Sequence, residues 1–273
     1  MPASGVDCST MFAETTNKNR RFELTSPVAL ITNALAFAGP AAVDSLLKAG
    51  FQVVVHDVAF ISAQAQADYQ RAKPDVLVLQ SQAPEQIVES AWARSNRLDV
   101  LVSNDAFAPI NGPIEDAATE SLQATLDRLV VFPFAIAKAA IPRLKAQAKA
   151  RVVFISSSRN RLPLRGGAIP DIARAGANAL VKSLSIELAP HSIPVNAIAP
   201  NYFYSEMYYP KARFVDDAAG REYIERVVPA GRLGTAEEMG ELIVYLATMQ
   251  GAFMTGAIID FAGGWPVAIA PPN

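Results

Sequence analysis

The sequence has few of the features that indicate a disulfide, a membrane span, nucleic-acid binding or a metal site. Its single cysteine, Cys8, cannot form an internal disulfide, and with no secretory signal in the sequence this favours a reducing, cytoplasmic location. No run of about 18 apolar residues occurs, so no membrane span is predicted. The formal net charge of −2, with both signs mixed along the chain, gives no electrostatic case for nucleic acid. The two histidines, His56 and His191, lack a second ligand at metal-binding spacing, so we expect no metal site.

What is present is enough apolar sequence for a large core. Hydrophobic residues make up 51% of the 273 residues and charged residues 18%. Short apolar runs, typical of buried strands, alternate with segments of helical spacing. The runs lie at 28–32, 52–57, 74–79, 98–104, 150–157, 194–200 and 257–264, and the helical segments at 39–51, 84–96, 118–148, 170–189 and 236–248. This alternation predicts the α/β class, with one doubly wound, Rossmann-like parallel sheet covered by helices on both faces.

The domain predicted from this pattern spans 27–273. Residues 1–26 are rich in Ser, Thr, Asn and charge, and we interpret them as a flexible N-terminal extension. An irregular segment is expected between the run at 194–200 and about residue 228. In a doubly wound sheet, ligands bind at the carboxyl ends of the strands, so we look for functional residues there.

The turn after the first predicted strand lacks the glycines of a nucleotide-binding loop. Such loops let backbone N–H groups approach a pyrophosphate at a helix N-terminus. The sequence here is "TNALAFAGPAA" (32–42), with one glycine, Gly39, and with the bulky Leu35 and Phe37 where phosphates need bare backbone. We therefore expect no nicotinamide cofactor, and Phe37 belongs either to the core or to a pocket wall. Asp57 lies where a ribose-binding acid would stand, but without the loop we expect it to cap the next turn.

Several motifs resemble the short-chain dehydrogenase/reductase superfamily and, within it, the halohydrin dehalogenases, which keep the fold without the cofactor. The motifs are "TNALAFAG" (32–39), "HDVAF" (56–60), "VLVSNDAFAP" (100–109), "RAGA" (174–177), "PNYFYSE" (200–206), "GRLGTAEEMGELIVYLA" (231–247) and "AGGWP" (262–266). The resemblance runs from Val28 to Trp265. It implies conversion of vicinal halohydrins to epoxides with release of halide, and the reverse opening of epoxides by small anions. It also implies a homotetramer, joined through the apolar helices at 118–148 and 170–189.

The resemblance further implies a catalytic set in the pattern Ser-x12-Tyr-x3-Arg. Ser157 fits the serine that holds the substrate oxygen, and Arg174 fits the arginine that lowers the pKa of the tyrosine base. The middle position holds Pro170, which has no ionisable group, although proline is compatible with the first turn of a helix. Ser156 and Ser158 should point away from the face that carries Ser157, because side chains alternate along a strand.

The missing tyrosine leaves the identity of the proton acceptor open. Asp171 lies three residues before Arg174, so the two can pair on one helix face, either as a replacement base or as a plain surface ion pair. A phenol from Tyr204, Tyr208 or Tyr209 is a further alternative, but the sequence gives no geometry for it.

The segment after the run at 194–200 is bulky where dehydrogenases leave room for nicotinamide. Successive backbone N–H groups in a turn bind anions, and aromatic ring edges are electropositive. The resemblance assigns halide binding to Pro200, Tyr202 and Phe203, and the other interpretation is an aromatic lid that buries apolar surface. The substrate pocket is expected to include Phe37, Phe107, Pro109 and Asn201. Asp105 either caps its loop or orders water near the leaving ion.

Two functions of other kinds compete with the dehalogenase hypothesis. One is an NAD(P)-dependent short-chain reductase, against which the sequence of the first loop speaks. The other is a non-catalytic pseudoenzyme that keeps the fold for assembly or ligand sensing, and Pro170 is the residue in its favour.

Overall fold

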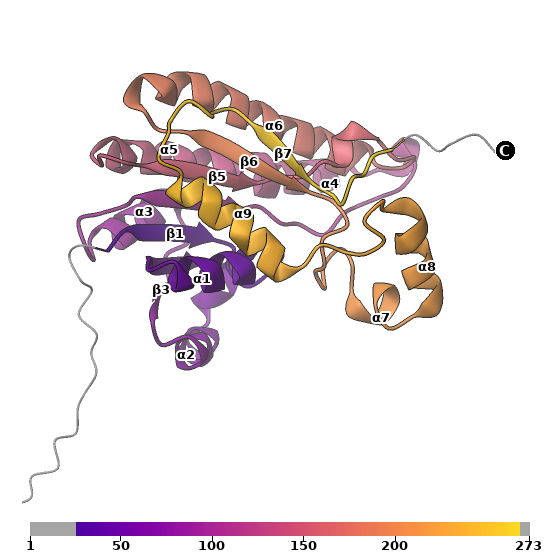
Figure 1. Cartoon of the computed structure of the whole chain (residues 1–273), viewed down its shortest axis with the longest axis horizontal. Coiled ribbons are helices and arrows are strands. Elements are labelled where there is room, and N and C mark those ends of the chain that lie inside the picture. The colour runs from indigo at the N-terminus through magenta and orange to yellow at the C-terminus, as the bar shows by residue number, and fades with distance from the viewer. Residues whose placement is uncertain (1–25, 268–273) are drawn as a thin grey trace, which may run out of the picture.

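The computed structural model describes residues 26–267. Cys8 and nearly all of the predicted extension at 1–26 therefore lie outside the described residues, as does the segment 268–273. The described chain forms a seven-stranded, all-parallel sheet in the order β3-β2-β1-β4-β5-β6-β7 (Figure 1). The strands are β1 (Val28–Thr32), β2 (Gln52–His56), β3 (Val76–Leu79), β4 (Val100–Asn104), β5 (Arg151–Ile155), β6 (Val195–Pro200) and β7 (Ile258–Phe261). This confirms the predicted Rossmann-like α/β fold.

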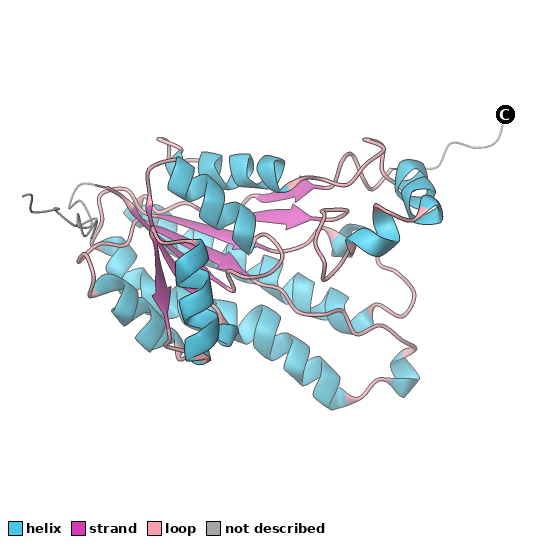
Figure 2. Ribbon diagram, turned by 90° about the horizontal axis from the view of Figure 1, so that it is seen from below, coloured by secondary structure: helices cyan, strands magenta, loops and turns pink. Residues whose placement is uncertain are grey.

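Helices cover both faces of the sheet (Figure 2). They are α1 (Gly39–Lys48), α2 (Ala63–Ala72), α3 (Pro84–Trp92), α4 (Thr119–Leu126), α5 (Phe132–Lys145), α6 (Ala168–Leu188), α7 (Lys211–Phe214), α8 (Ala218–Val227) and α9 (Ala236–Thr248). One core places α1 and α9 on the face of Ile31, and the other places α3, α5 and α6 on the face of Leu30. The strands β1, β4, β5 and β6 are buried along their whole length, so most of their residues are apolar.

The structure differs from the predicted elements at three places. Helix α2 was not predicted, since none of its residues is buried and no apolar face marks it in the sequence. The helix predicted at 118–148 is divided into α4 and α5 by a π-helical turn, Asp127–Val131. The segment predicted to be irregular contains α7 and α8, which Figure 1 shows in orange beside the carboxyl ends of the strands.

Helix α6 presents the central part of the site. It begins at Ala168, so Pro170 is buried in the first turn, where its missing N–H costs no helical hydrogen bond. Arg174 follows one turn later on the buried face. Among the described helices, none combines the length and apolar character that a bilayer crossing requires.

Candidate active site

A cavity of about 490 Å³ opens at the carboxyl edge of the sheet. Its walls come from the loops after β1, β4, β5 and β6, from the first turns of α6, and from α7 and α8. The predicted site residues that line it are Phe37, Phe107, Pro109, Ser157, Arg174, Pro200, Asn201, Tyr202 and Phe203. Pro170 lines it too, whereas Asp171 is not among the lining residues. The structure thus gathers segments that are far apart in the sequence around one space.

Ser157 follows β5 and faces this cavity. Its hydroxyl accepts a hydrogen bond from the Arg159 N–H at 3.1 Å and donates one to the Pro200 carbonyl at 3.3 Å. Ser156 is buried and donates to the Asn178 side chain at 2.5 Å, and neither Ser156 nor the buried Ser158 lines the cavity. The alternation predicted for the three serines therefore selects Ser157.

Arg174 is 4% exposed and donates two hydrogen bonds of different kinds. One N–H reaches the backbone carbonyl of Asp105 at 3.0 Å, and another reaches the phenol oxygen of Tyr208 at 3.2 Å. The carboxylate of Asp105 accepts from the hydroxyl of Ser103 at 3.0 and 3.2 Å. Burial raises the pKa of Asp105 to about 7, against the opposing effects of the Ser103 hydrogen bonds and the charge of Arg174.

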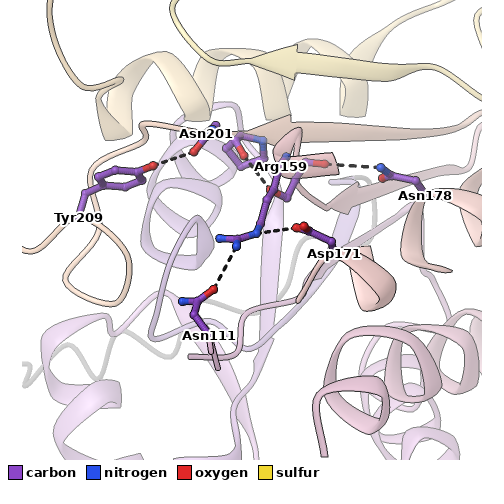
Figure 3. Close-up of polar contacts among 8 residues, drawn as sticks. Asn111, Arg159, Asp171, Asn178, Asn201 and Tyr209 are labelled. Atoms are coloured by element: carbon purple, nitrogen blue, oxygen red, sulfur yellow. Dashed lines mark hydrogen bonds and ion pairs between the residues drawn. The ribbon is translucent and has the colours of Figure 1, made fainter. Parts of the chain in front are cut away.

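The predicted pair of Asp171 with Arg174 is replaced by a different ion pair. Asp171 accepts a hydrogen bond from Nε of Arg159 at 2.6 Å, and Arg159 also donates to the Asn111 side chain at 3.0 Å (Figure 3). Gly167 makes room for this arrangement, because a Cβ there would lie 2.5 Å from Nη2 of Arg159 and 2.8 Å from Oδ2 of Asp171. Asp171 therefore pairs with a residue of the segment after Ser157, while Arg174 contacts Asp105 and Tyr208.

An aromatic wall of the cavity consists of Phe37, Tyr202 and Phe203, and two of these residues, Phe37 and Tyr202, have unusual backbone geometry. Their φ angles are 57° and 52°, in a left-handed region that bulky residues rarely adopt. The Phe37 ring meets Phe203 edge to face at 5.7 Å and Tyr208 at 4.9 Å. Such outliers persist where the surrounding structure holds them, and they cluster at functional sites.

Gly39 and Asp57 lie where a nucleotide site would be expected, and both have a structural role in this fold. A Cβ on Gly39 would lie 2.5 Å from the Ala34 carbonyl oxygen, so the glycine allows the loop to fold back onto itself. Asp57 accepts hydrogen bonds from the N–H groups of Leu35 and Ala59, each at 3.0 Å. This confirms that Asp57 caps the turn after β2.

Asn201 organises the far side of the cavity. Its side-chain oxygen accepts a hydrogen bond from the Tyr209 hydroxyl at 2.7 Å (Figure 3). The same oxygen accepts another from the Tyr202 N–H at 3.1 Å. Burial raises the pKa of Tyr209 to about 12 and also raises that of Tyr202. Both phenols therefore stay protonated near neutral pH, and Tyr209 donates to Asn201.

Tyr208 is the site residue that the sequence could not place. It stands in the loop after β6, where its N–H donates to the hydroxyl of Ser205 at 3.2 Å. Its own hydroxyl donates to the Phe107 carbonyl at 2.9 Å and accepts from the Phe107 N–H at 3.1 Å, beside the contact with Arg174. The only sequence signal is the density of tyrosines in this loop.

Within residues 26–267, no three His, Cys, Asp or Glu side chains gather as metal ligands would. His56 is buried, stacks on Phe132 at 5.5 Å and bonds to Gln82 at 3.4 Å. Burial lowers its pKa, so it is neutral near pH 7 and serves the core.

Comparison with known proteins relates the chain to reductases and to dehalogenases. Residues 38–266 match the family described as Enoyl-(Acyl carrier protein) reductase. The 3-oxoacyl-(acyl-carrier-protein) reductase FabG of Escherichia coli is 29% identical over 240 residues, which cover 87% of this chain and 96% of the relative. A solved structure of halohydrin dehalogenase (HheC) bound to ethyl (2S)-oxiran-2-ylacetate is 32% identical, with a TM-score of 0.87, and the match covers 90% of this chain and 100% of the other. Another solved structure, described as a dehalogenation enzyme, is 33% identical with a TM-score of 0.84, over 89% of this chain and 99% of the other.

Proposed function

Because the chain belongs to the short-chain dehydrogenase/reductase superfamily, we propose that it is one of the members that have exchanged hydride transfer for displacement of halide. The reaction is the conversion of a vicinal halohydrin to an epoxide, and in reverse the opening of an epoxide by a small anion. The observation that carries the proposal is that Ser157 and Arg174 line one cavity with the aromatic wall of Phe37, Tyr202 and Phe203. The identity and TM-score shared with two dehalogenase structures support it further.

The serine suits the role of holding the substrate oxygen. Its hydroxyl now donates to the Pro200 carbonyl over a long 3.3 Å, and an oxygen of the substrate can take the place of that carbonyl. The N–H of Arg159 fixes the hydroxyl from the other side, at 3.1 Å. Ser157 then orients the alcohol of the halohydrin, or the oxygen of the epoxide, with its proton pointing at the substrate.

The halide has a natural place beside Asn201. The amide oxygen of Asn201 accepts hydrogen bonds from the Tyr202 N–H and the Tyr209 hydroxyl. Two donors thus converge on this oxygen, as they would on a bound anion. A halide that replaces it would receive the same two donors and would lie against electropositive ring edges. We therefore assign halide binding to the backbone from Pro200 to Phe203, with Tyr209 as an added donor.

No nicotinamide is needed for this reaction, since no hydride moves. The loop after β1 fits a protein without such a cofactor, because Phe37 packs its ring onto Phe203 and Tyr208 at the start of α1. The same loop explains Gly39 without a pyrophosphate, through its close approach to Ala34. We propose that the cavity works without a bound cofactor.

An NAD(P)-dependent reductase is the second candidate, and the sequence relatives favour it, since FabG and others of them are reductases. A pseudoenzyme is the third, and Pro170 is the feature on which it depends. The three candidates differ in what they bind and release, so one set of assays separates them.

The test is release of bromide from a simple vicinal bromohydrin by the purified chain, beside Ser157→Ala, with NADH binding measured on the same preparation. The dehalogenase requires turnover that Ser157→Ala lowers, with no NADH binding at submillimolar concentration. Binding of NADH at that concentration would instead support the reductase hypothesis. Bromide that binds beside Pro200–Phe203 while neither the wild type nor Pro170→Tyr turns over would leave the pseudoenzyme.

A further inference from the structure

The cavity poses a problem that the proposed function does not answer, namely which group takes the proton of the substrate alcohol. Among the described residues that line it there is no Asp, Glu, His, Cys or Lys. The ionisable side chains in the wall are the arginines and tyrosines Arg159, Arg174, Arg213, Tyr202, Tyr208, Tyr209 and Tyr223. Arginine stays protonated in proteins, so a proton acceptor in this wall has to be a phenol.

The four tyrosines in the cavity wall differ in what their hydroxyl groups contact. Burial raises the pKa of Tyr202 and Tyr209, which opposes ionisation. The hydroxyl of Tyr223 lies 3.5 Å from that of Tyr202. Tyr208 alone among them has its hydroxyl on a guanidinium, that of the buried Arg174 at 3.2 Å. We infer that Tyr208 is the catalytic acid and base of this site, a role that rests on the proposed function.

The environment of the Tyr208 oxygen suits a phenol that gains and loses a proton. Two N–H groups point at this oxygen, one from Arg174 at 3.2 Å and one from the Phe107 backbone at 3.1 Å. Fixed donors aimed at an oxygen stabilise the negative charge that develops there when its proton leaves. The guanidinium is itself held by the Asp105 carbonyl, at 3.0 Å.

The ring of Tyr208 is held as firmly as its hydroxyl. It packs edge to face on Phe37 with centroids 4.9 Å apart, and its backbone N–H is fixed by Ser205, which is 6% exposed. The phenol reaches Arg174 from the loop after β6, while Pro170 occupies the helix position from which a tyrosine would otherwise reach it. The two arrangements deliver the same pair of functional groups, phenol and guanidinium, from different segments.

The chemical step balances with no further reactant. The Tyr208 hydroxyl, which donates a hydrogen bond in the structure, first gives its proton to solvent. The phenolate oxygen then takes the proton of the substrate hydroxyl, and the resulting alkoxide oxygen forms a bond to the neighbouring carbon. The bond from that carbon to the halogen breaks, and its electron pair leaves with the halide. The proton then passes from Tyr208 to solvent. In the resting structure the hydroxyl donates to the Phe107 carbonyl at 2.9 Å, and the substrate oxygen replaces that carbonyl as its partner.

Asp171 is the competing base, and the structure disfavours it. Its carboxylate is held by Arg159 at 2.6 Å, and the residue is not part of the cavity wall. A carboxylate in that position would have to leave its ion pair to reach a substrate. Tyr208 already lines the cavity, and it has to exchange its hydrogen bond with the Phe107 carbonyl for one with the substrate.

The central experiment compares bromide release by the wild type, by Tyr208→Phe and by the matched control Tyr204→Phe. Tyr204 lies in the same loop, is 36% exposed and bonds to Glu206. General acid–base catalysis contributes roughly 100- to 10,000-fold, so kcat should fall at least ~100-fold in Tyr208→Phe and less than about twofold in Tyr204→Phe. Equal kcat in the wild type and Tyr208→Phe would overturn the role of Tyr208 while leaving the proposed function intact.

A rescue variant distinguishes loss of the phenol from loss of the fold. In Pro170→Tyr/Tyr208→Phe a phenol returns from α6, and kcat should recover by at least about tenfold over Tyr208→Phe. Quenching of tryptophan fluorescence by bromide reports on the halide side, because Trp265 lines the cavity and its ring lies 5.8 Å from that of Tyr202. The quenching should be the same in the wild type and Tyr208→Phe, and its loss would show a collapsed site and overturn the assignment.

The failure of this inference and the failure of the proposed function have different signatures. An inactive wild type with an active Pro170→Tyr would refute Tyr208 as the base and preserve the dehalogenase frame. Inactivity of both, with the bromide site absent, would refute the proposed function and the inference that depends on it.

Discussion

Replacing Asp105 by Asn should change how the stability of the protein depends on pH. Asp105 is 2% exposed, lies beside the buried Arg174, and has a pKa raised by burial to about 7. In the unfolded chain an Asp loses its proton near pH 4 (~3.9). Between these two values the folded state holds more protons than the unfolded state, so the free energy of unfolding falls as pH rises.

The magnitude follows from the difference between the two pKa values. A separation of about three pH units corresponds to ~4 kcal/mol, which is present below about pH 4 and is lost as pH rises through about 7. The Asn side chain has the shape of the protonated carboxyl and does not titrate. The wild type should therefore lose up to ~4 kcal/mol relative to Asp105→Asn between pH 4 and pH 8.

Urea unfolding followed by tryptophan fluorescence, at a fixed protein concentration and at several pH values, measures this difference. A companion variant, Ser103→Ala, removes the hydroxyl that donates to the carboxylate at 3.0 Å. Its loss should raise the pKa of Asp105 further, so the decline should grow and extend to higher pH. Parallel curves for the wild type and Asp105→Asn would refute the account of a protonated, buried carboxyl.

Three further outcomes are expected. Asp171→Asn releases Arg159 and should raise KM for the bromohydrin while kcat changes less than about threefold; a loss of kcat by orders of magnitude would instead make Asp171 the base. Thr235→Ala removes the side chain that caps α9, accepting from the Glu238 N–H at 3.3 Å, and should lower the free energy of unfolding by ~1 kcal/mol in urea titrations, with an unchanged curve arguing against the capping box. Light scattering at micromolar concentration should give a tetramer, because Phe134 on α5 and Ile186 on α6 are 52% and 75% exposed in the single chain, and a monomer would count against it.

The sequence predicts the helices and strands whose burial produces a local pattern of apolar residues. Apolar runs predicted all seven strands, since most of the sheet is buried on both faces, and helix α6 was evident from its apolar spacing. Helix α2 could not be found in this way, because it buries no residue. The capping role of Asp57 was predictable since the Ala59 N–H that it accepts from lies only two residues further on, whereas its second partner, the Leu35 N–H, is 22 residues away.

The site was predictable only where residue spacing decides geometry. The resemblance placed Ser157 and Arg174 through the spacing of the Ser-x12-Tyr-x3-Arg pattern, and strand alternation set Ser156 and Ser158 aside. The partner of Asp171 could not be placed in this way, because two candidates, Arg174 at three residues and Arg159 at twelve, differ only by the course of the chain after β5. The contact of Tyr208 with Arg174 depends on how the loop after β6 folds back, and no periodicity encodes that path.

The loop from Pro200 to Pro210 carries both a wall of the cavity and the phenol that rests on Arg174. Any excursion that widens the entrance by lifting this loop also separates phenol from guanidinium. With Tyr208 as proton acceptor, ligand exchange and the chemical step then cannot occur at the same time. In the open state ligands enter and leave, but the Tyr208 oxygen lacks its contact with Arg174. In the closed state that contact is made and the reaction proceeds. Each turnover would then require this loop to open for exchange of ligands and to close again for the chemical step.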